Sequence, residues 1–318
     1  MATDGAPPRE GLAAAPSMTG GPAYPSASPL WRTCFGGEGA WRPGGARGDA
    51  GARAGHRVTM VIDKGTPLGY FLDLLEVAAP HVRFWKLAFG SALLYEPEQV
   101  RARVERARQR GVEVYAGGTL LEIARTMGDA GATLEQMARL GLRWVEISDG
   151  TFPLTPDRRA ALIGQALDHG FAVITEVGSK DPSHRFMPEA AAAQVEADLD
   201  AGACFVLVEA RDSGQGIGVY DPQGRLDRRV WQALWERLSR PDRVIWEAPR
   251  ADQQRELMSL LGPDVNLGNV QVGDVLTLAS MRWGLRSDTI RVWTAGRDGS
   301  TGDGQAGRRR VDGALRQG

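Results

Sequence analysis

Four segments in the middle of the chain decide its fold: Trp144-Val-Glu-Ile-Ser-Asp149, Val173-Ile-Thr-Glu176, Phe205-Val-Leu-Val-Glu-Ala-Arg211 and Val244-Ile-Trp-Glu247. Each is a strand-like apolar run with a carboxylate at or near its end. The runs recur about every 30 to 35 residues, the length of one strand–helix unit. Parallel strands end at one face of their sheet, so we expect these carboxylates to converge on one cavity.

Other apolar segments complete a regular alternation, with further strands expected at Val58–Lys64, Val82–Lys86, Val112–Ala116 and Val265–Asn269. Amphipathic stretches separate the strands. Eight strands alternating with eight helices in roughly 235 residues predict an α/β protein with a single (β/α)8 TIM barrel. A doubly wound open sheet is the alternative, but it usually has a glycine-rich first turn, which is missing here.

The two ends of the chain differ in composition from this segment. Residues 1–56 are rich in Gly, Ala, Pro and Ser, and residues 291–318 are rich in Gly. Such stretches bury too little apolar surface to offset the entropy of ordering them. We therefore expect a catalytic barrel at 57–290 between disordered extensions. An upstream start codon is the alternative explanation of residues 1–56.

Composition excludes several classes of function. The net charge of -1 gives no global field that favours nucleic acid or membrane. No apolar run approaches membrane-spanning length, and the N-terminus lacks the apolar region of a signal peptide. The two cysteines, Cys34 and Cys204, have no metal-ligand spacing. We expect a cytoplasmic globular protein that binds neither nucleic acid nor membrane.

Side-chain alternation predicts a charged barrel interior. Val145 and Ile147 would face the helices while Glu146 faces the barrel axis. The same parity places further charged residues inside, namely Lys86, Glu176, Glu209, Arg211 and Glu247. Burying such charges unpaired is costly, so a divalent metal with an anionic substrate is the favoured explanation. A structural ion-pair network is the alternative.

Lys180 follows its strand by a few residues and would project over the cavity. A lysine near a metal and other cations can have a lowered pKa, which suits acid–base work. The alternative is an idle, solvated loop lysine. Lys64 and Lys86 end the first two strands and are candidate anion contacts, and Arg211 could clamp an anion with two hydrogen bonds. Gly117-Gly-Thr119 opens a helix and could cradle an anion on its N–H groups.

From about Val58 to Thr289 the chain resembles the phosphosulfolactate synthase family of coenzyme M biosynthesis. The resemblance rests on short motifs in family order, among them Asp63-Lys-Gly65, Val114-Tyr-Ala-Gly-Gly-Thr119, Val145-Glu-Ile-Ser-Asp-Gly150, Thr175-Glu-Val-Gly178, Lys180-Asp-Pro182, Glu209-Ala-Arg211, Glu247-Ala-Pro249 and Val265-Asn-Leu-Gly-Asn269. It implies a carbon–sulfur lyase acting synthetically, which adds sulfite to phosphoenolpyruvate with Mg²⁺ to give 2-phospho-3-sulfolactate. We also expect a homo-oligomer.

The resemblance also implies roles for individual residues. Lys180 matches the family's proposed general acid, and Glu176 and Arg211 are the other catalytic candidates. The acidic positions expected to supply the Mg²⁺ ligands are Glu146, Asp149, Glu176 and Glu209. Substrate contacts are expected from Lys64, Lys86, Arg211, Asn266 and Asn269.

One loop departs from the family pattern. The family usually reads Lys-x-Gly-Trp-Gly-Thr-Ser after the second strand, whereas this chain reads Lys86-Leu-Ala-Phe-Gly-Ser-Ala92. A related enolate-type enzyme with another nucleophile or acceptor is therefore the first alternative. A non-catalytic protein resembling plant heat-stress proteins is the second, but retention of Lys180, Arg211 and the acidic strand ends argues against it.

Overall fold

Eight parallel strands close into one barrel in the computed structural model, which describes residues 57–181 and 185–294. Each strand pairs with its neighbours in sequence, and β1 closes on β8. The strands are β1 Thr59–Asp63, β2 Phe84–Leu87, β3 Glu113–Ala116, β4 Trp144–Ile147, β5 Ala172–Val177, β6 Phe205–Val208, β7 Val244–Glu247 and β8 Leu267–Gln271. The predicted TIM barrel is confirmed, although β8 begins two residues later than predicted.

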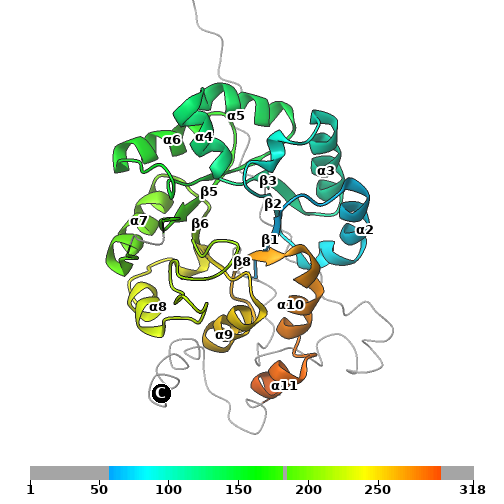
Figure 1. Ribbon diagram of the computed structural model, residues 1–318, viewed down its shortest axis with the longest axis vertical. Helices are drawn as coiled ribbons and strands as arrows, with labels where there is room; N and C mark the ends of the chain where they lie inside the picture. The colour runs from blue at the N-terminus through cyan, green and yellow to red at the C-terminus, as the bar shows by residue number, and fades with distance from the viewer. Residues whose placement is uncertain (1–56, 182–184, 295–318) are drawn as a thin grey trace, which may run out of the picture.

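Helices surround the barrel, as Figure 1 shows. They are α2 Leu68–Ala78, α3 Pro97–Gln109, α4 Thr119–Met127, α5 Ala130–Arg139, α6 Pro156–Asp168, α7 Pro188–Asp200, α8 Arg228–Trp235, α9 Ala251–Leu261, α10 Val275–Arg282 and α11 Ser287–Thr294. Short 3-10 helices are η3 Ala79–His81, η4 Ser91–Leu93, η5 Pro241–Arg243 and η6 Val272–Asp274. Prolines open α3, α6 and α7, where the ring fixes φ and its missing N–H is not needed.

The ends of the chain bear on the predicted boundaries. The expected N-terminal extension, residues 1–56, lies outside the described residues, as does the tail from residue 295. Helix α11 continues to Thr294, past the predicted end of the barrel at residue 290. Among the described residues, no helix combines the length and apolar character needed to cross a membrane.

The barrel interior has two layers of opposite character. The lower layer is apolar and includes Phe84, Trp144, Ile174, Leu207 and Ile245, all at most 1% exposed. Two residues further along the same strands, the inward positions become charged: Lys86, Glu146, Glu176, Glu209 and Glu247. The rings of Phe84 and Trp144 meet edge to face at 4.7 Å between centroids. The apolar layer therefore closes the barrel beneath a charged layer at the carboxyl ends of the strands.

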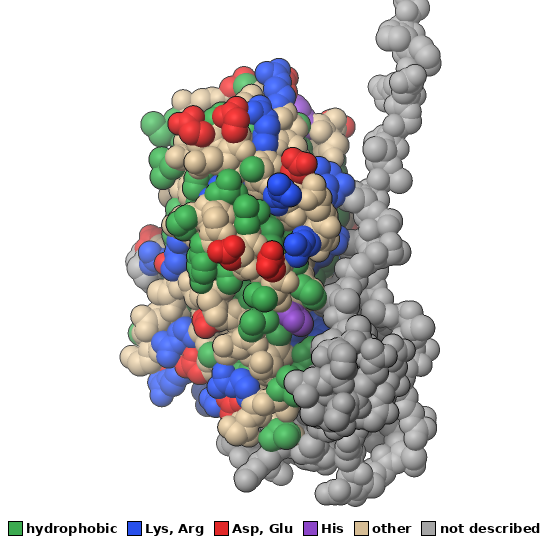
Figure 2. Space-filling view, turned by 90° about the vertical axis from the view of Figure 1, so that its right-hand side faces the viewer, with side chains coloured by type: hydrophobic (Ala, Val, Ile, Leu, Met, Phe, Trp, Pro, Cys, Tyr) green, Lys and Arg blue, Asp and Glu red, His purple; other side chains and the backbone are tan. Residues whose placement is uncertain are grey.

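The outward side chains of the strands pack on the helices. Trp246 lies 6.2 Å from Trp231 of α8 and 6.5 Å from Trp235, measured between ring centroids. Trp246 therefore faces α8, as expected for the neighbour of an inward-facing Glu247. On the side of the molecule in Figure 2, basic and acidic side chains are interspersed over the outer faces of the helices.

A buried arginine joins two helices to β5, the strand that carries Glu176. Arg159 of α6, with a side chain 2% exposed, donates to both carboxylate oxygens of Asp198 on α7, at 2.8 and 2.6 Å. It also donates to Asp149 Oδ1 after β4 and to the backbone carbonyl of Glu176 on β5, both at 2.8 Å. This one guanidinium therefore holds β5, α7 and the loop after β4 in a fixed arrangement.

We expect Arg159→Met to lower the free energy of unfolding by about 3–5 kcal/mol, because it leaves the buried Asp198 carboxylate without its counter-ion. Urea titration of the purified variant measures this. Adding Asp198→Asn to Arg159→Met should recover part of the loss. The matched control is Arg139→Met, whose ion pair with Glu135 is exposed and should contribute less than about 1 kcal/mol. If Arg159→Met lowered the free energy of unfolding as little as Arg139→Met does, the structural role of Arg159 would be contradicted.

Candidate active site

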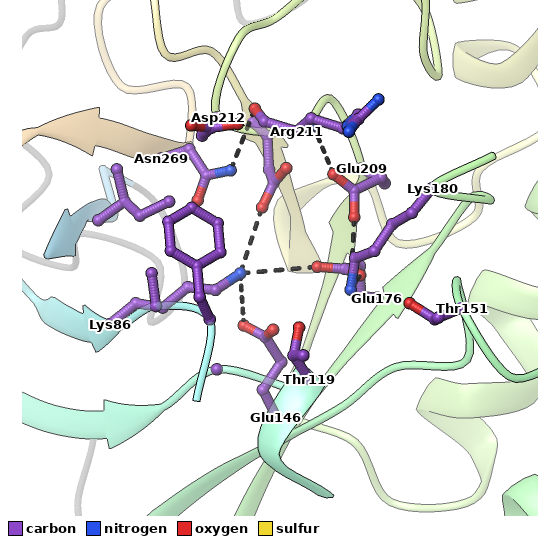
Figure 3. A pocket seen from close by; sticks show the side chains of 15 residues that line it. Lys86, Thr119, Glu146, Thr151, Glu176, Lys180, Glu209, Arg211, Asp212 and Asn269 are labelled. Atoms are coloured by element: carbon purple, nitrogen blue, oxygen red, sulfur yellow. Dashed lines mark hydrogen bonds and ion pairs between the residues drawn. The ribbon is translucent and has the colours of Figure 1, made fainter. Parts of the chain in front are cut away.

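The charged layer opens into a pocket of about 320 Å³ at the carboxyl ends of the strands (Figure 3). Its charged lining residues come from most of the barrel, and they are Lys86, Glu146, Glu176, Lys180, Glu209, Arg211, Asp212 and Glu247. Of the described residues that line it, five are therefore acidic and three are basic. This is the face of a TIM barrel where active sites lie.

Lys86 stands at the centre of this layer. Its Nζ lies 3.0 Å from Glu146 Oε2, 3.4 Å from Glu247 Oε1 and 3.6 Å from Glu176 Oε2. Burial lowers the pKa of Lys86, but Glu146, Glu247 and Glu176 raise it further, so the pKa lies well above its ordinary value. The buried ammonium of Lys86 thus faces the pocket carboxylates, among them Glu146 and Glu176 (Figure 3).

Lys180 also lies among three carboxylates. Its Nζ is 3.1 Å from Glu176 Oε1, 3.3 Å from Glu122 Oε1 and 3.8 Å from Glu209 Oε2. Burial lowers the pKa of Lys180, but Glu176, Glu209 and Glu122 together raise it above its ordinary value. Among these side chains the carboxylates outweigh the neighbouring Lys86, whereas the predicted lowering of the Lys180 pKa supposed a metal nearby and stays a prediction. The side chain is only 25% exposed, so it is not an idle solvated lysine.

Sequence reasoning missed Glu122 on α4, which is 1% exposed. Its Oε2 accepts hydrogen bonds from the backbone N–H of Thr151 at 2.9 Å and of Phe152 at 3.0 Å. Its Oε1 accepts from Ser148 Oγ and contacts Lys180. Glu122 thus ties Lys180 to the loop after β4. One sequence signal could have pointed to Glu122: it lies in the first turn of a helix that was expected to begin beside the pocket.

Three carboxylates form a cluster of the kind that binds a metal. Glu176, Glu209 and Glu247 each offer one oxygen within 4.8 Å of the others. Burial raises the pKa of Glu209 well above its ordinary value, with Glu176 as the next cause. Burial likewise raises the pKa of Glu247 to about 7, whereas Lys180 and then Lys86 overcome burial at Glu176 and lower its pKa to about 2. If all three carboxylates were ionised, the cluster would carry more negative charge than Lys86 and Lys180 balance, so the protonated form of Glu209 is favoured unless a further cation binds.

The donor set fits a hard divalent cation. Glu209 Oε2 and Asn269 Oδ1 are buried and make no hydrogen bond within the described residues. Both residues line the pocket together with Glu176 and Glu247. Mg²⁺ takes carboxylate and amide oxygens as ligands and keeps several waters, for which the pocket has room.

Two predicted site residues lie elsewhere. Asp149, a predicted metal ligand, lies outside the pocket because it pairs with Arg159 and accepts from the backbone N–H of Leu154 at 3.2 Å. Asn266, a predicted substrate contact, lies at the other end of the barrel because β8 begins only at Leu267. There its amide accepts from the backbone N–H of Val58 at 2.9 Å and donates to two carbonyls of the β7 region. Neither residue is among the described residues that line the pocket.

Glu146 lines the pocket, but its oxygens already have partners. Oε1 accepts from the backbone N–H of Gly118 at 2.7 Å, and Oε2 accepts from Tyr115 Oη at 3.0 Å and contacts Lys86. The predicted anion cradle at Gly117–Thr119 therefore holds the protein's own carboxylate. Glu247 joins Glu176 and Glu209 as a candidate ligand in its place.

The remaining predicted contacts lie at the rim. Lys64 is exposed and pairs with Asp212 at 3.4 Å, and Asp212 in turn lines the pocket. Arg211 lines the pocket with an exposed side chain, and its backbone N–H donates to Glu209 Oε1. Asn269 Nδ2 lies 3.4 Å from the Arg211 carbonyl oxygen. The loop that follows Arg211, which reads Asp212-Ser-Gly-Gln-Gly-Ile-Gly218, thus begins at the pocket mouth.

Lysine usage is a signal that sequence reasoning overlooked. Of 38 Lys and Arg residues in the chain, only three are lysines: Lys64, Lys86 and Lys180. All three lie at the carboxyl ends of strands or in the loops just beyond. A chain that otherwise uses arginine has kept the ammonium group only around this pocket.

Comparison with known proteins identifies the family of this chain. The model of the (2R)-phospho-3-sulfolactate synthase (ComA) family matches residues 53–288. The phosphosulfolactate synthase of Methanothermobacter thermautotrophicus is 40% identical over 235 residues, which are 73% of this chain and 91% of that protein. This chain belongs to the phosphosulfolactate synthase family. The corresponding protein of Methanocaldococcus jannaschii is 35% identical over 73% of this chain and 93% of its own length. The corresponding protein of Bacillus subtilis is 32% identical over 73% of this chain and 91% of its own length.

The departure from the phosphosulfolactate synthase motif after β2 can now be placed. Ala88 and Phe89 line the pocket, whereas Ser91 and Ala92 are not among the described residues that line it. Ser91 is 8% exposed, and its Oγ makes no hydrogen bond within the described residues. The loop therefore affects the pocket through Ala88 and Phe89, not through the hydroxyl positions.

Proposed function

We propose that this protein catalyses the Mg²⁺-dependent addition of sulfite to phosphoenolpyruvate, giving 2-phospho-3-sulfolactate, with Lys180 as the general acid. The observation that supports this most is the arrangement of two lysines among five buried glutamates at the mouth of a barrel of this family. Carboxylates fit a cation, and the ammonium groups fit the proton transfer and the anions.

Charge balance supports a requirement for the metal. Acidic side chains outnumber basic ones among the described pocket residues, while both proposed substrates are anions. Glu176, Glu209 and Glu247 would hold the ion, with the amide oxygen of Asn269 as a further candidate. When bound, Mg²⁺ would supply positive charge to stabilise the carboxylate of phosphoenolpyruvate as negative charge builds on it.

The proposed bond changes need one nucleophile and one proton. The sulfur lone pair of sulfite forms a bond to C3 of phosphoenolpyruvate, and the C2–C3 π electrons move onto C2 and its carboxylate. Lys180 then delivers a proton to C2, which leaves a saturated phosphosulfolactate, and the lysine regains its proton from water. The carboxylates around Lys180 keep it protonated before the reaction, and a cation held by Glu176 and Glu209 would offset their charge and so ease release of the proton.

The other basic residues suit binding. Lys86 stays charged beneath the substrates, and Arg211 reaches the pocket from the rim, where its planar guanidinium can form two parallel hydrogen bonds to an anion. Lys64, released from Asp212, can contact a phosphate or sulfite group at the mouth. The use of lysine at these positions, in a chain with 38 basic residues of which only three are lysines, supports a need for ammonium.

Product formation tests the proposal directly. Purified protein with phosphoenolpyruvate, sulfite and Mg²⁺ should form a sulfonated phosphate ester, followed by ³¹P nuclear magnetic resonance and mass spectrometry. Omitting sulfite should leave phosphoenolpyruvate unchanged. Consumption of phosphoenolpyruvate with no sulfonate formed would overturn the assignment of sulfite and favour another acceptor.

Excess EDTA should abolish product formation, and Mg²⁺ or Mn²⁺ should restore it. Glu209→Gln should weaken Mn²⁺ binding at least about tenfold, measured from the free Mn²⁺ signal in electron paramagnetic resonance, because it removes a ligand charge. Asp149→Asn is the matched control and should leave Mn²⁺ affinity unchanged, since Asp149 lies outside the pocket. Full activity in EDTA would remove the metal from the mechanism.

Lys180→Ala should lower kcat by roughly 10² to 10⁴, the usual scale for a positioned general acid, with a smaller effect on KM. Lys180→Arg should not restore kcat, because the longer, planar guanidinium cannot place an N–H where the compact ammonium does. Lys64→Arg is the control for a change of side chain that keeps the positive charge, and it should lower kcat by less than about tenfold. Steady-state kinetics decide the matter: a kcat near wild type for Lys180→Ala would shift the acid role to Lys64 or Lys86.

A further inference from the structure

Backbone strain is concentrated around the pocket. In the described part of the chain, the non-glycine residues with positive φ are Arg57, Phe89, Arg211 and Asn269. The last three all line the pocket. For an L-residue this conformation costs about 1–2 kcal/mol, and such strain persists where function requires it. Arg211 and Asn269 already have proposed roles as polar contacts, whereas Phe89 has none.

Phe89 occupies a turn position that suits it badly. The Ser91 N–H donates to the Ala88 carbonyl at 2.8 Å, which closes a tight turn with Phe89 (φ 55°) and Gly90 (φ 69°) at its centre. Two positive φ angles are the mark of a type I′ turn, whose central positions favour Gly, Asn and Asp. A bulky aromatic residue at the first of them is therefore unexpected.

Packing does not explain the aromatic residue either. Phe89 is 58% exposed, so most of its ring surface gains nothing from burial. It nevertheless lines the pocket, together with the apolar residues Ile62 and Ala88. These three residues form the apolar wall of an otherwise largely polar pocket, and Phe89 is the most exposed of the three.

We propose that Phe89 is a specificity-determining residue that covers the methylene end of the substrate. This rests on the proposed function, because phosphoenolpyruvate has charged groups on C1 and on the C2 oxygen but only hydrogens on C3. The charged groups fit the metal and the basic side chains, which leaves C3 to the apolar wall. A methyl substituent on C3 would meet the Phe89 ring, so the residue selects the unsubstituted three-carbon acid.

A stability comparison tests the strain by itself. Phe89→Ala and Phe89→Gly both remove the ring, but only glycine relieves the left-handed backbone. Phe89→Gly should therefore melt about 2–4 °C above Phe89→Ala, the shift expected for roughly 1 kcal/mol in a domain of this size. Leu94 in the same loop is the control: it is 87% exposed with φ −94°, so its alanine variant should be at least as stable as its glycine variant. If the two Phe89 variants melted at the same temperature, or Phe89→Ala melted higher, the backbone at this position would not be strained.

Substrate selection tests the role. The kcat/KM ratio for phosphoenolpyruvate over its C3-methyl homologue, (Z)-2-phosphooxybut-2-enoate, should be about 10 to 200 in the wild type, the range for one methylene in an apolar pocket. Phe89→Ala and Phe89→Gly should lower this ratio at least about tenfold, whereas Leu94→Ala should not change it. An unchanged ratio in the Phe89 variants of an enzyme that does make the sulfonate would overturn this proposal alone. A wild type that makes no sulfonate would overturn the proposed function, and this proposal with it.

Discussion

The carboxylate of Glu176 is the point on which the site depends, because both pocket lysines converge on it. One of its oxygens lies 3.1 Å from Lys180 and the other 3.6 Å from Lys86. Its backbone carbonyl accepts from Arg159, which fixes β5 against α6 and α7. Lys180 belongs to the loop that follows this strand. A shift of β5 would therefore move a candidate metal ligand and the proposed acid together.

Buried ion pairs of this kind are a poor means of stabilising a protein. Removing charged groups from water costs several kcal/mol per ion, and the attraction between them often does no more than offset that cost. In this site the attraction offsets the cost of burial even less fully, since burial and like charge raise the pKa of Glu209 and Glu247. The apolar layer beneath supplies the stability, and the proposed binding of a cation and of anionic substrates would account for the charged layer.

Strand periodicity was enough to predict the barrel and most of the site. Alternation placed Lys86, Glu146, Glu176, Glu209 and Glu247 on one inner face, and the structure puts all five in one pocket. Periodicity failed where a residue lies beyond its strand. Asp149 sits in a loop, and only the fold shows that Arg159 holds it away from the pocket. Asn266 was expected at the pocket from its place in a family motif, but it precedes β8 and lies at the amino ends of the strands, whereas Asn269, three residues later, reaches the pocket.

Tertiary contacts explain the other differences. Glu122 reaches Lys180 from a helix 58 positions earlier in the chain, a contact that no local pattern encodes. The pKa of Lys180 follows from how many carboxylates surround it, and the sequence does not determine that number. The left-handed backbone of Phe89 depends on the turn between β2 and η4, where the sequence offers only Gly90 as a hint.

The central claim is that surplus negative charge excludes anionic substrates until a divalent cation binds. The chain has only three lysines, all around the pocket, so protein labelled with ¹⁵N at lysine Nζ reports on this site alone. The account predicts that Mg²⁺ shifts the Lys86 and Lys180 signals, and that phosphoenolpyruvate shifts the lysine signals further only when Mg²⁺ is present. Equal shifts by phosphoenolpyruvate in Mg²⁺ and in EDTA would contradict it.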